Sequence, residues 1–307
     1  MKRESCPICS SPEISVALHE VRDYITGEKF DVLHCGSCEV SFTYPQPKNM
    51  DKYYPARYRR YNKAILAILK ALYRYQVNRW ERLFQKPGFA LEIGCCDGLM
   101  LDALRKNGWG VAGTERTQEM AEFARKNLGL EVYVGGFEEI PRSKRFDLVI
   151  LFQVLEHMND PVKILKQCAG VLNSNGKIVI AVPNSGSWQY AYATSNWFHL
   201  DVPRHLFHFS PKSLGNTLHR AGLEVSSVSF VSFEHDPYGW IQSILNKQWN
   251  NRNVLTRQLM NLDSTTWSSI AFILIGVLWA IPSLLLSMVS WGAHRGAIMQ
   301  IVSSRRV

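Results

Sequence analysis

Two pairs of cysteines near the start of the chain have the spacing of metal ligands. Cys6 and Cys9 form one Cys-x-x-Cys pair, Cys35 and Cys38 form the other, and 25 residues separate the pairs. Four thiolates arranged in this way make a closed tetrahedral zinc site of the structural kind. The odd total of seven cysteines also favours metal binding in a reducing compartment over a disulfide framework. We therefore predict a zinc ribbon over residues 1–48, with an iron site of the rubredoxin type as the alternative.

A glycine-rich turn is the second group of residues with a chemical use. In the run LEIGCCDG, Glu92, Gly94, Cys96 and Gly98 fall on an E-x-G-x-G-x-G frame, whereas NAD sites usually carry G-x-G-x-x-G. Glu115 ends the next apolar run, where a carboxylate can accept hydrogen bonds from both hydroxyls of a ribose. These residues predict a site for a nucleoside-containing cofactor, and they favour a methyltransferase site over an NAD site.

Histidines that could act as a general base follow two of the apolar runs. His157 comes shortly after the run Phe146–Phe152, at the edge where ligands bind in parallel sheets. The segment WFHLDVPRHLFHFSP contains His199, Arg204, His205 and His208. Histidine is the usual base near neutral pH. We predict that His157 or His205 is the base; a packing or hydrogen-bonding role is the alternative for each.

The elements that must position these residues alternate between strand and helix over 87–233. This pattern predicts an α/β fold: a Rossmann-like sheet of seven strands, mostly parallel with the last strand antiparallel, and helices on both faces. The predicted strands are Phe89–Ile93, Gly110–Thr114, Glu131–Val134, Phe146–Phe152, Lys177–Val182, Glu224–Phe233 and Ala297–Ser303. The last of these belongs to residues 294–307, which we expect to return to the sheet after an insertion at 234–293.

A basic linker at 49–86 precedes the predicted sheet. Between Lys52 and Lys86 there are ten Lys or Arg residues and one acid, Glu81, in a chain whose net charge is +9. This patch suits anionic lipid headgroups or nucleic acid, and a solvated helix face is the alternative. The run from Ala64 to Phe84 is predicted to be an amphipathic helix. Its apolar stripe is expected to contain Ile65, Ile68, Leu69, Leu72 and Tyr73.

Four motifs over about 90–233 resemble the class I S-adenosylmethionine (SAM)-dependent methyltransferases. They are LEIGCCDG, VAGTE, FDLVILFQVLEHMNDP and GKIVIAVPN, in that order. Within that class the chain is similar to the branch that contains the ubiquinone-biosynthesis O-methyltransferases and enzymes of bacterial polysaccharide clusters. Some enzymes of the second kind carry zinc ribbons, as do some ribosomal RNA methyltransferases.

The resemblance implies a role for each residue around the cofactor. Glu92, Gly94 and Gly98 are implied to surround the methionine part of SAM, and Glu115 is implied to hold its ribose. The turn at Gly136 and Phe137 is implied to flank the adenine, and Gln153 to lie near the sulfonium. The expected cofactor-binding residues are thus Glu92, Gly94, Cys96, Gly98, Glu115, Gly136, Phe137 and Gln153. Two positions depart from the family pattern: Cys96 replaces a glycine, which requires a negative φ there, and Gly136 replaces a frequent aspartate.

The favoured function is O-methylation of a glycan or of a lipid-linked acceptor at a membrane surface. The alternatives are a quinone-precursor O-methyltransferase, a ribosomal RNA methyltransferase, and a scaffold that binds cofactor without chemistry. Methylases of exocyclic base amines carry an Asn/Asp-Pro-Pro-aromatic turn where this chain has Phe152-Gln153-Val154, so a nucleic-acid substrate is the weaker interpretation.

An apolar run near the end predicts membrane contact. Ile270–Val289 is mostly Leu, Ile, Val, Ala and Phe, and 20 such residues are enough to span a bilayer. A simple crossing conflicts with the fold, because a strand of the sheet precedes the run and another follows it. Pro282 is expected to break the helix into two arms. We therefore predict a re-entrant or in-plane hairpin, in a protein that lacks a secretory signal and is cytoplasmic, on the inner face of the membrane. A buried core helix is the alternative.

Overall fold

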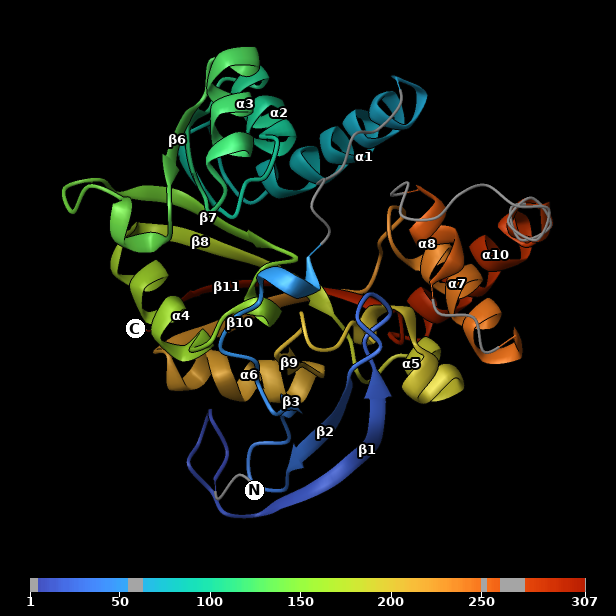
Figure 1. The fold of residues 1–307 in the computed structure, drawn as a ribbon. Coiled ribbons are helices and arrows are strands. Elements are labelled where there is room, and N and C mark those ends of the chain that lie inside the picture. Colours follow the sequence, from blue (N-terminus) through green and yellow to red (C-terminus); the bar gives the residue numbers. More distant parts are fainter. Residues whose placement is uncertain (1–4, 55–62, 250–252, 260–273, 307) are drawn as a thin grey trace.

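A seven-stranded sheet forms the centre of the molecule, with the spatial order β10-β11-β8-β7-β4-β5-β6 (Figure 1). The computed structural model describes residues 5–54, 63–249, 253–259 and 274–306. The strands of this sheet are β4 (Phe89–Ile93), β5 (Gly110–Glu115), β6 (Glu131–Val134), β7 (Phe146–Phe152), β8 (Leu172–Pro183), β10 (Leu223–Ser229) and β11 (Ile298–Arg305).

The pairing within the sheet confirms the predicted fold class. The neighbours from β8 through β7, β4 and β5 to β6 are parallel, whereas β11 is antiparallel to both β8 and β10. The chain runs from β4 outward to β5 and β6, then returns to β7 on the other side of β4. Ligands of such sheets bind at the carboxyl ends of the strands, where the order reverses. A ligand site is therefore expected at the carboxyl ends of β4 and β7.

Each strand extends as far as its residues pair with a neighbouring strand. β6 and β7 have the predicted bounds. β8 begins at Leu172 instead of Lys177, because Leu172 pairs with Phe146 across an irregularity in the ladder. β10 ends at Ser229, the last residue that pairs with β11, whereas the prediction ran on to Phe233.

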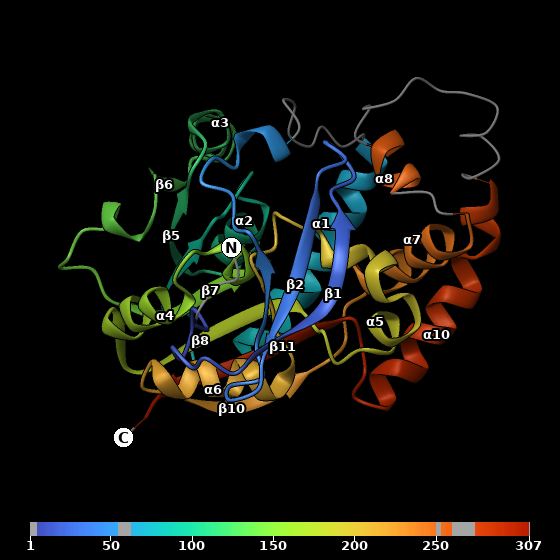
Figure 2. The ribbon, with the colours of Figure 1, turned by 60° about the horizontal axis from the view of Figure 1, so that its bottom comes forward.

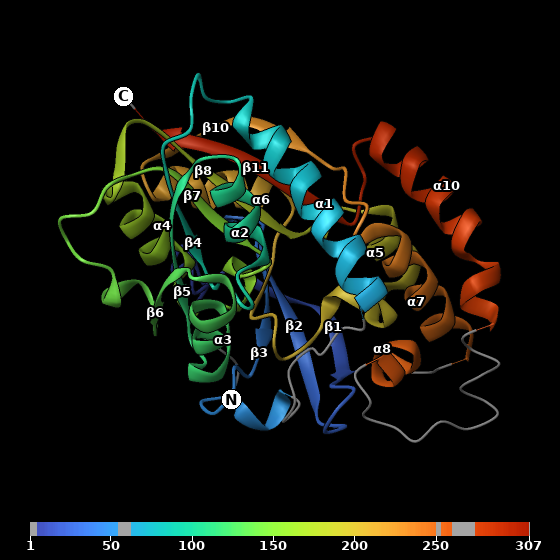
Figure 3. The ribbon, with the colours of Figure 1, turned by 90° about the horizontal axis from the view of Figure 1, so that it is seen from above.

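Helices cover both faces of the central sheet (Figures 1 and 3). They are α1 (Lys63–Glu81), α2 (Leu99–Lys106), α3 (Gln118–Leu128), α4 (Pro161–Gly170) and α6 (Pro211–Arg220). On one face, α1 and α2 pack through Trp80 and Leu104, and on the other α4 and α6 pack through Leu165 and Leu214. Local capping fixes two starts: Asp160 accepts the N–H of Lys163 before α4, and Ser210 and Ser213 form a capping box before α6.

The inward face of α1 differs from the predicted stripe. Gln76, Val77 and Trp80 are buried against the sheet, and Tyr73 packs beside them. Ile68 was expected on the same face, but 60% of it is exposed. The predicted stripe was chosen by hydrophobicity alone. The side chain of Gln76 is buried as well, because its neighbours Val77 and Trp80 pack on the sheet.

The amino-terminal strands form a second sheet with a segment of the core (Figure 2). β1 (Ile14–Arg22), β2 (Lys29–Cys35) and β3 (Ser41–Tyr44) are antiparallel, and β3 pairs in turn with β9 (Phe207–His208). A short turn of 3-10 helix, η1 (Asp51–Tyr53), follows. The buried guanidinium of Arg204 joins the two parts, because it lies 2.8 Å from Asp23 of the ribbon and 2.6 Å from Asp201.

The insertion after β10 is a helical layer beside the sheet. It contains α7 (Asp236–Trp249), α8 (Val254–Leu259) and α10 (Ala280–Gly292), and α5 (Trp188–Ala193) packs on α7. The start of the predicted apolar run, 270–273, lies outside the described residues. Within the described part, residues 274–278 are helical and the interruption falls at Trp279, while Pro282 occupies the first turn of α10. Because proline has no N–H to bond the carbonyl four residues earlier, an interruption in the turn before Pro282 agrees with the predicted break into two helical arms.

None of the helices in the described part of the chain combines the length and the apolar character needed to cross a bilayer. The remaining short turns of 3-10 helix are η2 (Phe137–Glu139), η3 (Leu155–His157), η4 (Thr194–Asn196) and η5 (Phe198–Leu200).

Candidate active site

The turn after β4 has a backbone that only glycine adopts easily at two positions. Gly94 has φ +70° and Gly98 has φ +77°, both in the left-handed region. A Cβ on Gly94 would lie 2.8 Å from Cγ2 of Val154, and one on Gly98 would lie 2.5 Å from Cδ1 of Leu130. The turn is thus both left-handed and closely packed at the carboxyl end of β4.

Cys96 does not meet the condition that the sequence set for it. Its φ is +49°, so the expected negative φ is wrong. The strain of a left-handed residue with a Cβ, on the order of 1 kcal/mol, is offset locally. Carboxylate oxygen Oε2 of Glu115 accepts the N–H of Cys96 at 3.0 Å, and the carbonyl of Thr114 accepts the N–H of Cys95 at 2.9 Å.

Acidic groups surround the turn. Glu92 is buried at the end of β4, and its Oε2 has no hydrogen-bond partner among the described residues. Burial, with the nearby charges of Asp97 and Glu115, raises the pKa of Glu92 well above its usual range. Glu115 also accepts the N–H and the hydroxyl of Thr117, each at 2.9 Å. A cationic ligand fits this environment, because it would relieve the repulsion among the carboxylates.

The other predicted cofactor residues lie at the ends of β6 and β7. Gly136 donates its N–H to Oε1 of Glu138 at 3.1 Å, and Phe137 packs half-buried against the core. Gln153 follows β7 with φ +57°, and its Nε2 is buried with no hydrogen-bond partner in the described part of the chain. The structure therefore gathers the predicted residues at one edge of the sheet, on the four strands from β7 to β6.

The two candidate bases meet beside this edge. The rings of His157 and His205 are 4.7 Å apart between centroids. Nδ1–H of His157 donates to the carbonyl of Arg204 at 2.9 Å, and Nδ1–H of His205 donates to the carbonyl of His199 at 2.9 Å. Because carbonyls only accept, each ring keeps its lone pair on Nε2. Burial lowers the pKa of His157 to about 3 and that of His205 to about 4, so both rings are neutral at pH 7.

Glu156 belongs to this cluster, although the sequence analysis did not select it. Its side chain is 1% exposed, and neither carboxylate oxygen has a hydrogen-bond partner among the described residues. Its Oε1 lies 4.0 Å from Nε2 of His205. Burial raises the pKa of Glu156 to about 8. Its position next to His157 in the sequence could have pointed to Glu156. No sequence pattern shows that its side chain turns inward. One ligand atom from each of Glu156, His157 and His205 lies within 4.8 Å of the others, so the cluster could also hold a metal ion.

Tyr54 connects the candidate bases with the predicted ribose site, although no sequence pattern marks this residue. Its hydroxyl is 3.5 Å from Nδ1 of His157, and the guanidinium of Arg116 lies 5.4 Å from its ring centroid. Arg116 follows Glu115 directly. The segment after the ribbon therefore forms one wall between the two parts of the site.

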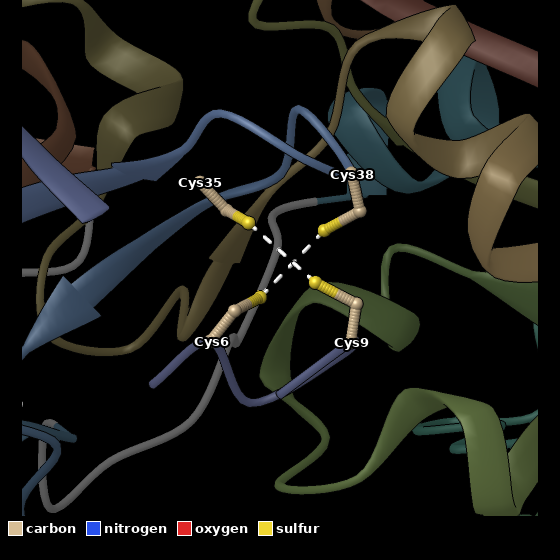
Figure 4. A group of neighbouring side chains, drawn as sticks. All are labelled: Cys6, Cys9, Cys35 and Cys38. Atoms are coloured by element: carbon tan, nitrogen blue, oxygen red, sulfur yellow. Dashed lines mark hydrogen bonds between the residues drawn. The ribbon is translucent and has the colours of Figure 1, made fainter. Parts of the chain in front are cut away.

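The four ribbon cysteines face one another (Figure 4). The sulfur atoms of Cys6 and Cys38 are 3.6 Å apart and those of Cys9 and Cys35 are 3.5 Å apart. All four ligand atoms lie within 4.8 Å of one another. In a tetrahedral zinc site with Zn–S bonds of about 2.3 Å, the sulfur atoms are about 3.8 Å apart. The cluster therefore fits a zinc ion.

Comparisons with known proteins agree with this arrangement. A family model described as a methyltransferase domain matches residues 58–228, more than half of the chain. The ubiquinone biosynthesis O-methyltransferase of Coxiella burnetii (strain Dugway 5J108-111) is 26% identical over 118 residues, which are 36% of this chain and 50% of that protein. The protein of the same name from Bradyrhizobium diazoefficiens is 32% identical over 108 residues, 34% of this chain and 43% of that protein. The chain thus spans about half the length of these relatives.

Among solved structures, a SAM-dependent methyltransferase from Archaeoglobus fulgidus is similar at 18% identity. Its TM-score is 0.49, over 80% of this chain and 100% of that one. The strand order and the turn after β4 define a class I, Rossmann-like methyltransferase fold. The chain belongs to the methyltransferase domain family, which confirms the resemblance read from the sequence motifs.

Proposed function

We propose that the chain transfers the methyl group of SAM to a hydroxyl oxygen. The observation that carries this proposal is the pair of neutral histidines, His157 and His205, with free Nε2 lone pairs beside the buried carboxyl of Glu156. They lie at the same edge of the sheet as the glycine turn. A hydroxyl acceptor needs its proton removed, and this cluster offers bases for it.

The residues of the turn fit the chemistry of SAM. When bound, SAM supplies a methyl group on a positively charged sulfur. Glu92 would hold the amino group of its methionine part, and Glu115 its ribose hydroxyls, while Gln153 would offer its unpartnered Nε2 near the sulfur. Positioning supplies much of the rate of such an in-line displacement.

The proton of the acceptor would pass to the histidine cluster. Nε2 of His157 or His205 accepts it first, because both rings are neutral at pH 7. Burial raises the pKa of Glu156 to about 8, so its carboxyl is mostly protonated at pH 7 and cannot take the proton over. The proton would instead leave the ring to solvent water.

For the acceptor, we propose a glycan or lipid-linked hydroxyl presented at a membrane surface. An outward-facing apolar helix in the insertion, described below, supports the membrane surface. A quinone precursor is the second candidate, and the names of the curated relatives favour it. We also propose that Cys6, Cys9, Cys35 and Cys38 bind one structural zinc ion, on the basis of their spacing and geometry.

The test is methyl transfer from labelled SAM into fractions of a bacterial extract. We expect label in the lipid-extractable fraction, with release of S-adenosylhomocysteine. Label confined to RNA would overturn the proposed acceptor. Absence of label in every fraction, from a protein that binds SAM, would overturn the transfer reaction and favour a cofactor-binding scaffold.

A further inference from the structure

Helix α10 has its polar side chains inside and its apolar side chains outside. Ser283, Ser287 and Ser290 are buried, and each hydroxyl donates to a carbonyl of the same helix, at 2.8–2.9 Å. This small-residue face packs on α7. The outward side chains are Ile281, Leu284, Leu285, Leu286, Met288 and Val289, of which Ile281 is 73% exposed and Val289 61%. A helix on the surface of a soluble protein normally has the opposite arrangement.

The apolar surface continues beyond α10. Leu274, Val277 and Leu278, in the preceding helical turn, are 60%, 67% and 76% exposed. At the other end, the ring of Trp291 contacts Phe233, and Phe233 contacts Tyr75 of α1, with centroids 4.8 and 5.7 Å apart. An exposed patch of this extent is typical of an interaction surface.

Basic side chains border this patch on more than one element. The guanidinium of Arg79 on α1 lies 5.8 Å from the ring centroid of Tyr75, and the exposed Arg295 follows α10. Trp188 is 41% exposed, and its backbone N–H donates to the carbonyl of Arg295 at 3.1 Å. From residue 274 to the end of the chain there is no Asp or Glu. Cations and tryptophan beside an apolar face are the pattern of helices that lie at the surface of an anionic bilayer.

We propose that the outward face of α10 and of residues 274–278 docks on an anionic lipid bilayer, with the helix in the plane of the membrane. This inference deepens the proposed function, because it rests on the proposed membrane-surface acceptor and names the face that meets it. A second copy of the chain fits the face less well: a symmetric contact would bring the basic border of one copy against that of the other. An anionic lipid surface attracts the same border.

The docking face is tied to the active site by direct contacts. Asp236, at the start of α7, accepts Nε1–H of Trp291 at 2.7 Å and the N–H groups of Ala297 and Ile298 at 3.0 and 3.1 Å. The ring centroid of His235, the residue before Asp236, lies 6.0 Å from that of Phe152, and Phe152 directly precedes Gln153. Figure 3 shows α10 at the outer rim, with α7 between it and the central sheet. A bilayer on α10 would therefore lie close to the edge where the acceptor must enter.

The test is co-sedimentation of the full chain with vesicles of phosphatidylcholine, with and without phosphatidylglycerol. We expect wild-type protein to bind the anionic vesicles. The double variant Ile281→Asp, Leu285→Asp should have an affinity for them that is lower by about tenfold or more. Both side chains are exposed, so the double variant is expected to fold; unchanged SAM affinity would verify this. Phe123→Asp is the matched control, because Phe123 is an exposed aromatic on α3 (46%) and should bind like wild type.

Two results would overturn the docking proposal. One is failure of the wild-type protein to bind either vesicle. The other is a wild-type dimer by light scattering that becomes a monomer in the double variant, since a second copy would then cover the face. Failure of the proposed function is a separate result, because a protein without methyl transfer would still bind vesicles through this face.

Discussion

Polar atoms that lack a protein partner mark the site at the scale of single residues. Among the described residues, Oε2 of Glu92, Nε2 of Gln153 and both carboxylate oxygens of Glu156 are buried without a hydrogen bond. A buried polar group without a partner costs about 1–3 kcal/mol. Several such groups at one sheet edge are best explained by ligands that complete them. Glu92 and Gln153 lie on the cofactor side, and Glu156 lies on the acceptor side.

The histidine cluster leads to a prediction about turnover. Replacing His157 or His205 by Ala should lower the rate of methyl transfer about 100-fold or more, because a positioned base is lost. The affinity for SAM, measured by calorimetry, should stay within a factor of two or so, since neither ring lies in the glycine turn. His219→Ala, a change near the end of α6 and outside the cluster, is the control. Normal turnover in both variants would mean that the acceptor needs no base from these residues.

At the scale of elements, the segment with the four clustered cysteines contacts the candidate active site. Thr43 of β3 donates its hydroxyl to the carbonyl of His205 at 2.6 Å, and its N–H donates to the carbonyl of Leu206 at 3.0 Å. The ribbon thus holds the backbone of a candidate base. Because the four cysteines fix β2 and the turn before β3, metal binding and the position of His205 should be coupled.

Removing the metal ligands should reveal this coupling. Elemental analysis is expected to find one zinc ion per chain in the wild type and none in the Cys35→Ser, Cys38→Ser double variant. The turnover of the double variant should also fall more than its affinity for SAM. Cys168→Ser is the control, because Cys168 lies on α4 and is not one of the four grouped cysteines, so this variant should retain zinc. A metal-free wild type, or zinc retained in the double variant, would refute the site.

The sequence predicted elements well where the pattern is local. β4 and β7 have the predicted bounds because their mostly apolar runs are buried in the middle of the sheet. β6 also has the predicted bounds, although it is an edge strand with one buried residue. The pairing of β3 with β9 was not predicted, since β9 has two residues and lies more than 160 positions from its partner. His157 and His205 were each predicted as a candidate base, but the contact between their rings was not predicted. The burial of Glu156 and the position of Tyr54 depend on contacts distant in the sequence, which no local pattern encodes.

At the scale of the whole molecule, buried ionisable groups predict how stability depends on pH. Burial lowers the pKa of four histidines: His157, His199, His205 and His208. Their neutral folded form loses stability as pH falls below about 6.5, because the unfolded chain then takes up protons. Burial raises the pKa of three carboxyls: Glu92, Glu156 and Asp236. Those groups lose stability as pH rises from about 4 to 8, because the unfolded chain releases protons.

Below pH 6.5 the histidines and the carboxyls change the stability in opposite directions, and there are four such histidines against three carboxyls. Well above pH 6.5 only the carboxyls change the stability. At pH 6.5 each histidine of the unfolded chain is only about half protonated, so the two effects balance near pH 6. We therefore expect the Tm of the protein without SAM to be highest near pH 6 and to fall toward pH 8. Calorimetric unfolding between pH 5 and 8.5 measures this. A Tm that keeps rising up to pH 8.5 would show that these carboxyls are ionised in the folded protein.

The proposed function depends on SAM binding at the turn after β4. Glu115 is the most informative residue, because it carries the predicted ribose contact and also holds the N–H of Cys96. Loss of its charge-assisted hydrogen bonds should weaken SAM binding by about 1.5–3 kcal/mol. Glu119→Ala is the matched control, since Glu119 is an exposed acid in the first turn of α3.

Calorimetric titration of SAM into the wild type, Glu115→Ala and Glu119→Ala is the most direct test. We predict one SAM per chain for the wild type and for Glu119→Ala with similar affinity. Glu115→Ala should bind on the order of 10- to 150-fold more weakly while circular dichroism shows an unchanged fold. A wild-type protein that does not bind SAM, or equal affinity in Glu115→Ala, would contradict the assignment of this turn as the cofactor site.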